Sequence, residues 1–169
     1  RRTVIPVQEL LDAAGKYFKK LMKNRPERIE LEIEPMEAKV IGDVNQLRFL
    51  LENLIDETLT VREDGVIRLQ ARKDNEYIRF LFTDTRREKS VEELNQLFYP
   101  NLARMTSGEK GELRGTEYLV CKQIIREHDE FTGLRGCRIN AEPAVGGGFT
   151  VWFTVPKASK GRAGEAVSR

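Results

Sequence analysis

The sequence predicts a two-layer α/β sandwich, in which about three helices cover one face of a mixed, mostly antiparallel sheet. Two observations lead to this fold class. Segments with an apolar residue at every third or fourth position follow segments in which apolar and polar residues alternate. Glycine, proline, asparagine and aspartate separate these segments. The 169 residues suffice for one core, so we expect one domain at residues 1–156 and a flexible tail at 157–169.

In the first half of the chain, predicted helices alternate with predicted strands. Residues 6–23 carry apolar side chains at helical spacing, and residues 29–33 alternate as a half-buried strand does. The next helix spans Asp43–Thr58, with the aspartate placed to cap it and an apolar stripe behind. Two alternating segments, 66–72 and 77–83, flank a polar turn and predict a β-hairpin.

The second half repeats this alternation around a polar interruption. Residues 90–98 start with a capping serine and end before a proline, so we expect a short helix. Residues 101–114 are polar and punctuated by glycine, as is typical of a mobile loop. A helix is expected at 115–128. Two strands, at 137–141 and 149–155, are expected on either side of a run of three glycines, which indicates a hairpin turn.

Composition excludes several classes of function. Twenty-nine basic and 27 acidic residues leave a net charge of +2 without a basic stripe, so no nucleic-acid partner is expected. One histidine and two isolated cysteines, Cys121 and Cys137, do not make a zinc site. The cysteines are expected to be free thiols in a reducing compartment. Because no run of about 18 apolar residues exists, we expect no direct membrane contact in this fragment. A cytoplasmic location is expected, either for the whole protein or for the cytoplasmic part of a membrane-anchored sensor.

Several segments, taken in order, resemble the ATPase domain shared by histidine kinases, gyrase-type ATPases and related chaperones. The resemblance includes a helix that carries Asn53, a strand that ends at Asp84, and a closing glycine-rich strand. It implies the histidine kinase-like (GHKL) ATPase fold over about residues 40–156, with ATP and Mg²⁺ as cofactors. The resembling segments are 41–56, 82–85, 97–102, 120–128 and 147–156.

The resemblance is weakest where the family binds adenine and metal. In the family, two asparagines four residues apart lie on one helix face, and the second ligates Mg²⁺. The first is kept as Asn53, but the second falls on Glu57. The carboxylate that accepts the adenine amino group is kept as Asp84, whereas the glycines after it fall on Arg86 and Glu88. Long side chains at glycine positions are expected to fill the adenine slot or to displace the loop.

The phosphate side of the implied pocket departs from the family pattern as well. Only Gly115 remains of a glycine-rich phosphate-binding segment, and Glu117 would repel an anion at the start of the next helix. The stretch 130–137 is also longer than the family's usual turn. The remnant nucleotide pocket implied by the resemblance consists of Asn53, Glu57, Asp84, Gly115 and Thr150, with Asn53 and Glu57 as its weak metal pair.

These losses predict a degenerate ATP-binding module of a two-component signalling protein, with weak or no ATP binding. Such a pseudokinase would contact other domains of the same protein or a response-regulator-like partner. One alternative is a working catalytic domain, in which Glu57 ligates the metal and Arg86 or Arg87 contacts phosphate, acting on a histidine outside this chain. Another is a remodelled cavity for a different small ligand.

Two further residues have competing interpretations. Asp84 either recognises adenine or pairs with a nearby base such as Arg86 or Arg87, and we favour the pairing. His128, the only histidine, matches the histidine that ends a helix in the family's ATPase domain, not the phosphorylated histidine. We therefore expect a structural role for His128.

Overall fold

The computed structural model describes residues 1–100, 106–107, 113–132 and 136–158. Within these residues, helices and strands follow one another in the alternating order that the sequence predicts. The elements are β1 (Thr3–Pro6), α1 (Val7–Met22), β2 (Ile29–Ile33), β3 (Lys39–Gly42), α2 (Val44–Thr58), β4 (Gly65–Asp74), β5 (Tyr77–Asp84), α3 (Val91–Gln96), β6 (Thr106–Ser107), β7 (Leu113–Arg114), α4 (Glu117–Thr132), β8 (Ile139–Pro143) and β9 (Phe149–Pro156).

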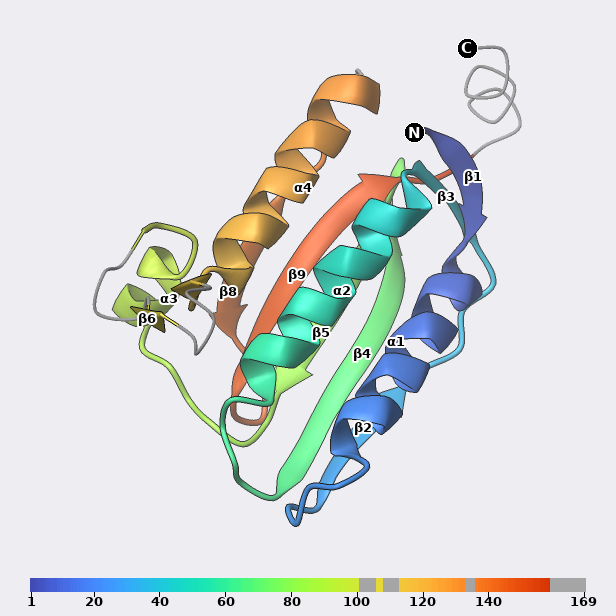
Figure 1. Cartoon of the computed structure of the whole chain (residues 1–169). Helices are drawn as coiled ribbons and strands as arrows, with labels where there is room; N and C mark the ends of the chain where they lie inside the picture. The colour runs from blue at the N-terminus through green and yellow to red at the C-terminus, as the bar shows by residue number, and fades with distance from the viewer. Residues whose placement is uncertain (101–105, 108–112, 133–135, 159–169) are drawn as a thin grey trace.

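A five-stranded sheet in the order β2-β4-β5-β9-β8 forms the main layer. Strand β2 runs parallel to β4, while the other neighbouring pairs are antiparallel. Helices α1, α2 and α4 lie side by side over one face of this sheet, with α2 in the middle (Figure 1). The predicted sandwich, with a mixed and mostly antiparallel sheet, is therefore confirmed.

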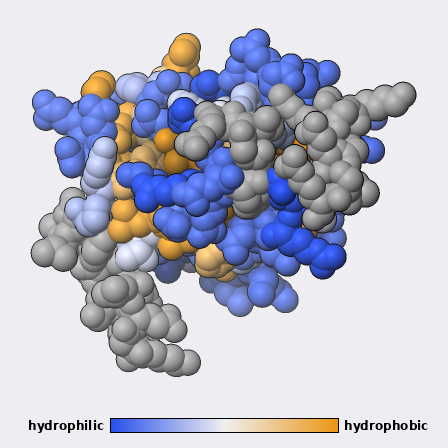
Figure 2. All heavy atoms as spheres, turned by 90° about the horizontal axis from the view of Figure 1, so that it is seen from above, coloured by the Kyte–Doolittle hydropathy of each residue, from blue (hydrophilic) through white to orange (hydrophobic). Residues whose placement is uncertain are grey.

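The core lies between these two layers. Alternate residues of β4 and β5 point toward the helices and are buried, and Phe80 stacks on Phe153 of the neighbouring strand with ring centroids 4.8 Å apart. Helix α2 contributes the apolar stripe expected from the sequence, Leu47, Leu50, Leu51, Leu54 and Ile55. Viewed from above, hydrophilic side chains dominate the described surface, and apolar ones emerge between them near the centre of this face (Figure 2).

Side chains fix the ends of two helices as predicted. Asp43 caps α2 by accepting a hydrogen bond from the backbone N–H of Gln46. At α3, Ser90 and Glu93 form a reciprocal capping box, in which each side chain accepts from the other residue's backbone N–H. No helix among the described residues is both long and apolar enough to cross a membrane.

Strand β1 was not predicted from the sequence. It pairs with β3 in a separate two-stranded antiparallel sheet, in which Val4 and Ile5 lie opposite Ile41 and Val40. Four residues that lead directly into a helix give too short an alternation to predict a strand. After β9, the backbone N–H groups of Lys157 and Ala158 donate to the carbonyls of Glu76 and Lys39.

Other boundaries differ from the predictions by a few residues. Helix α4 continues four residues beyond His128, α3 ends two residues before Phe98, and β8 begins two residues after Cys137. Most of the loop predicted at 101–114 lies outside the described residues, and its described parts form the short pair β6 and β7.

Candidate functional site

Asp84 ends β5 below the C-terminus of α2, and its carboxylate is paired. The Arg86 side chain donates from Nε to Oδ1 of Asp84 at 3.0 Å and from Nη2 to Oδ2 at 3.1 Å. The backbone N–H of Arg86 donates to Oδ1 as well, at 2.9 Å. Only 4% of the Asp84 side chain and 1% of the Arg86 side chain are exposed. Both oxygens of the predicted adenine-side carboxylate are therefore held by the residue two positions later.

The Arg86 guanidinium also binds three backbone carbonyls on the neighbouring segment. Nη2 donates to the carbonyl of Thr58, in the last turn of α2, at 2.8 Å. Nη1 donates to Val61 at 2.9 Å and to Glu63 at 2.8 Å, both in the connection from α2 to β4. Together with the two bonds to Asp84, there is one acceptor for each of the five N–H donors that a guanidinium offers. The buried charge is thus fully hydrogen-bonded.

Two glycines make room for this arrangement. A Cβ at Gly65, which has a φ of +146°, would lie 2.5 Å from Cγ of Arg86. A Cβ at Gly148, with a φ of +84°, would lie 2.1 Å from the carbonyl oxygen of Asp84. The hairpin between β8 and β9 therefore packs against the backbone that carries the aspartate. No pattern in the sequence had pointed to this role of Gly65.

Asn53 and Glu57 lie one turn apart on α2, as predicted. Asn53 is buried, and its side-chain amide donates to the carbonyl of Phe49 in its own helix at 2.8 Å. Glu57 is half-buried. Within the described part of the chain, no three His, Cys, Asp or Glu side chains gather as a metal site would need.

Acidic side chains crowd the space between α2 and the start of α4. One carboxylate oxygen of Glu117 is buried without a hydrogen-bond partner. Burial raises the pKa of Asp56, and the negative charge of Glu117 raises it further, although a hydrogen bond from the Tyr17 hydroxyl at 2.6 Å opposes the shift. Burial raises the pKa of the Cys121 thiol as well, with contributions from Glu117 and Glu57. Asp56 and Cys121 are therefore harder to ionise here than they would be in water.

The remaining predicted pocket residues are Thr150 on β9 and Gly115 before α4. Thr150 is buried on β9, and its hydroxyl hydrogen-bonds that of Thr83 across the strand pair at 2.7 Å. Gly115 has a φ of +81° just before α4, a left-handed conformation that favours glycine. Of the five predicted residues, Asp84 and Thr150 end up on neighbouring strands. Asn53 and Glu57 lie on α2.

Comparison with models of protein families identifies the family of this domain. The model of the histidine kinase-, DNA gyrase B- and HSP90-like ATPases matches residues 42–159, which is more than half of the chain. The chain belongs to this ATPase family. No curated protein sequence matches it significantly.

Solved structures agree with the family assignment at the level of fold. The nucleotide-free catalytic domain of the histidine kinase ThkA shares 19% identity at a TM-score of 0.70, covering 93% of this chain and 97% of that one. The mycobacterial sensor histidine kinase MprB shares 17% identity at a TM-score of 0.70, covering 93% and 98%. The ATP-binding domain of PrrB from Mycobacterium tuberculosis shares 16% at 0.67, covering 94% and 98%.

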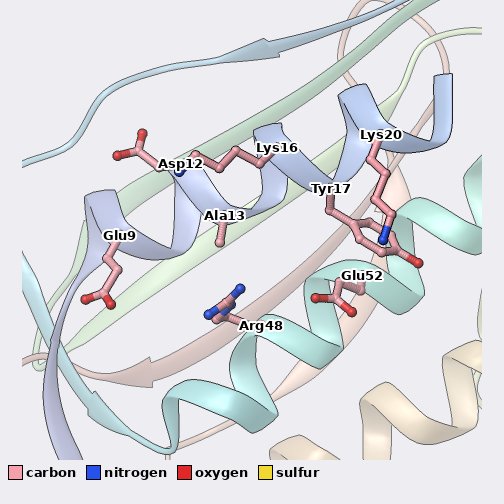
Figure 3. A pocket seen from close by; sticks show the side chains of 8 residues that line it. All are labelled: Glu9, Asp12, Ala13, Lys16, Tyr17, Lys20, Arg48 and Glu52. Atoms are coloured by element: carbon pink, nitrogen blue, oxygen red, sulfur yellow. The ribbon is translucent and has the colours of Figure 1, made fainter. Parts of the chain in front are cut away.

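This ATPase-family domain also has a pocket of about 700 Å³ between α1 and α2. Figure 3 shows acidic and basic side chains from both helices around it, with Arg48 and Glu52 on α2 facing α1. None of the predicted nucleotide-pocket residues lines it; the lining residues are Glu9, Asp12, Ala13, Lys16, Tyr17, Lys20, Arg48 and Glu52. Opposite charges line this groove in equal numbers, which is typical of a solvated surface between two helices.

Proposed function

We propose that this histidine kinase-like ATPase domain serves a two-component signalling protein as an interaction module that binds ATP weakly or not at all. The observation that carries the proposal is the buried pair of Asp84 and Arg86. In the family pattern, a carboxylate at this position accepts the amino group of adenine. Here both of its oxygens accept from Arg86 instead.

The relative energies favour the internal pair over adenine. Separating a buried, hydrogen-bonded ion pair costs about 3–5 kcal/mol. A single hydrogen bond from an adenine amino group to the charged carboxylate would return about 1.5–3 kcal/mol. The three backbone carbonyls that Arg86 also binds would lose their partner at the same time. Displacing Arg86 would therefore cost more than the adenine bond returns, and with Arg86 in place only 4% of the Asp84 side chain is exposed to a ligand.

The phosphate and metal end of the pocket suits a triphosphate equally poorly. Glu57 stands in place of a neutral metal-ligating asparagine, and Glu117 stands at the helix start where the family has backbone amides free of acidic neighbours. A buried carboxylate oxygen on Glu117 would face an anion without a compensating donor. These residues do not fit a bound Mg²⁺–ATP, so we derive no phosphoryl-transfer step through it.

The proposed partners are other domains of the same signalling protein or a response-regulator-like protein. Related structures support this class of partner. ThkA has been solved in complex with the response regulator protein TrrA, and ShkA as a full-length kinase in complex with AMPPNP. In the first of these, the likeness to this chain covers 42% of the relative's length. The kept scaffold, with its degenerate pocket, is what an interaction role requires.

Isothermal titration with ATP and Mg²⁺ tests the proposal. We expect no heat beyond dilution up to millimolar ATP, whereas full-length ShkA, titrated with AMPPNP in the same buffer, provides the positive control. Micromolar affinity for this chain would overturn the proposal and favour a working catalytic domain in which Glu57 ligates the metal. Phosphorylation of a histidine in the full-length protein would establish that alternative.

A thermal-shift screen of nucleotides and small metabolites addresses the remaining possibility, a different ligand in the remodelled cavity. Any ligand that binds only the folded state raises the unfolding temperature by mass action. A specific shift with a compound other than ATP would replace the interaction-module proposal with a sensor domain for that compound.

A further inference from the structure

We propose that the acceptors around Arg86 form a guanidinium-binding site, filled by the chain's own Arg86, which fixes the connection between α2 and β4. This site shares Asp84 with the proposed function, but the contacts of Arg86 exist whether or not the domain binds a nucleotide.

The acceptors come from three separate segments that Arg86 joins. Thr58 lies in the last turn of α2, Val61 and Glu63 lie in the connection, and Asp84 ends β5. Carbonyls at a helix C-terminus carry partial negative charge and lack partners within the helix. A guanidinium there therefore satisfies the helix end, the connection and the carboxylate at once.

The site is shaped for this side chain and not for positive charge in general. The five donor directions of a guanidinium are planar and fixed, and each meets an acceptor between 2.8 and 3.1 Å away. The missing side chain of Gly65 leaves the space through which the Arg86 methylenes pass. An ammonium group offers three donors from a single point, so lysine does not meet the same set of acceptors.

The neighbouring arginine provides an internal comparison. The Arg87 side chain is 52% exposed and forms one ion pair with the similarly exposed Glu63 carboxylate, at 2.7 Å. Exposed pairs of this kind contribute little to stability. Arg87 is thus a matched control, because it follows Arg86 directly and also reaches toward the connection, but without entering the site.

Chemical rescue tests the inference. The variant R86A removes the guanidinium but keeps the acceptors, so the domain is expected to unfold at a lower temperature than the wild type. Methylguanidinium chloride at millimolar concentration should raise the unfolding temperature of R86A, since it enters the vacated site. At about ten times its dissociation constant, it would lower the unfolding equilibrium constant roughly tenfold. The same concentration of methylguanidinium should not raise the unfolding temperature of the wild type or of R87A. Sodium chloride at equal ionic strength should not raise that of R86A.

Equal responses of R86A and R87A to methylguanidinium would overturn the inference. If R86A does not fold, R86K and the wild type keep it testable through amide hydrogen exchange. The amides of Thr60 and Val61, which bond back to the last turn of α2, should exchange faster in R86K than in the wild type. Unchanged exchange would overturn the inference. ATP binding by the wild type would overturn the proposed function alone and leave the rescue of R86A unaffected.

Discussion

Replacing His128 by glutamine is expected to remove a pH-dependent part of the domain's stability. His128 is fully buried on α4, where its Nε2 accepts a hydrogen bond from the backbone N–H of Asp43 at 3.0 Å. Because that donor is fixed, Nδ1 must carry the ring proton and donate to the carbonyl of Ile124 at 2.9 Å. The neutral ring thereby ties α4 to the start of α2. If the ring took up a second proton, at Nε2, that nitrogen could no longer accept from the Asp43 N–H, and the hydrogen bond would be lost.

The direction and size of the effect follow from the pKa of the imidazole. Burial lowers the pKa of His128 below its unfolded value of 6.5, although the bond to Ile124 and the charge of Asp43 act against the shift. The unfolded chain therefore binds a proton that the native state excludes. Stability is complete above pH 6.5 and is lost as the pH falls from there toward the lowered native pKa. The slope is at most about 1.4 kcal/mol per pH unit.

Urea unfolding of wild type and His128→Gln at pH 7.5 and pH 5.5 measures this contribution. Glutamine places an acceptor near the Nε2 position but does not titrate. At pH 7.5 the variant should be less stable by about 1–2 kcal/mol, because one hydrogen bond and the ring packing are lost. At pH 5.5 the gap should narrow by up to about 1.4 kcal/mol. The comparison cancels the carboxyl groups, which titrate in both proteins. Parallel pH profiles would refute a buried neutral histidine.

Three further predictions concern single side chains. Gly148→Ala should lower the free energy of unfolding by more than about 2 kcal/mol, as measured in urea. The alanine Cβ would overlap the Asp84 carbonyl oxygen, and the φ of +84° disfavours any residue but glycine. Stability close to that of the wild type would contradict the close approach of Gly148 to Asp84. Ser90→Ala should lower the free energy of unfolding by about 1 kcal/mol, since Ser90 and Glu93 cap α3 reciprocally. Glu92→Ala, two residues after Ser90 and outside the capping box, is the control. Cys121 is buried, and burial raises the pKa of its thiol, so iodoacetamide at pH 8 should leave it unmodified until urea unfolds the protein. Mass spectrometry locates the modified cysteine, and rapid labelling of Cys121 in the native protein would contradict this prediction.

The sequence alone determined the scaffold of this protein. Periodicity placed α1, α2 and the β4–β5 hairpin within a few residues, because helices and strands that bury one face have to repeat every 3.6 or 2 residues. Asp43 and Ser90 predicted where two helices begin, because an N-cap side chain bonds to a backbone N–H only two or three residues further along the chain. The ordered family segments then led to the ATPase family, which the match over residues 42–159 confirms.

The surroundings of Arg86 depend on contacts between residues far apart in the sequence, which no local sequence pattern predicts. The sequence showed that Arg86 stands where the family has glycine, and it favoured a pairing of Asp84 with a nearby base such as Arg86 or Arg87. It left open whether the Arg86 side chain fills the slot, displaces the loop or contacts phosphate. Only the folded chain brings the carbonyls of Thr58, Val61 and Glu63 around the guanidinium. Those residues lie 23 to 28 positions away along the chain, and a backbone carbonyl has the same chemistry in every residue. The tertiary structure alone therefore decided that Arg86, and not Arg87, is the partner of Asp84.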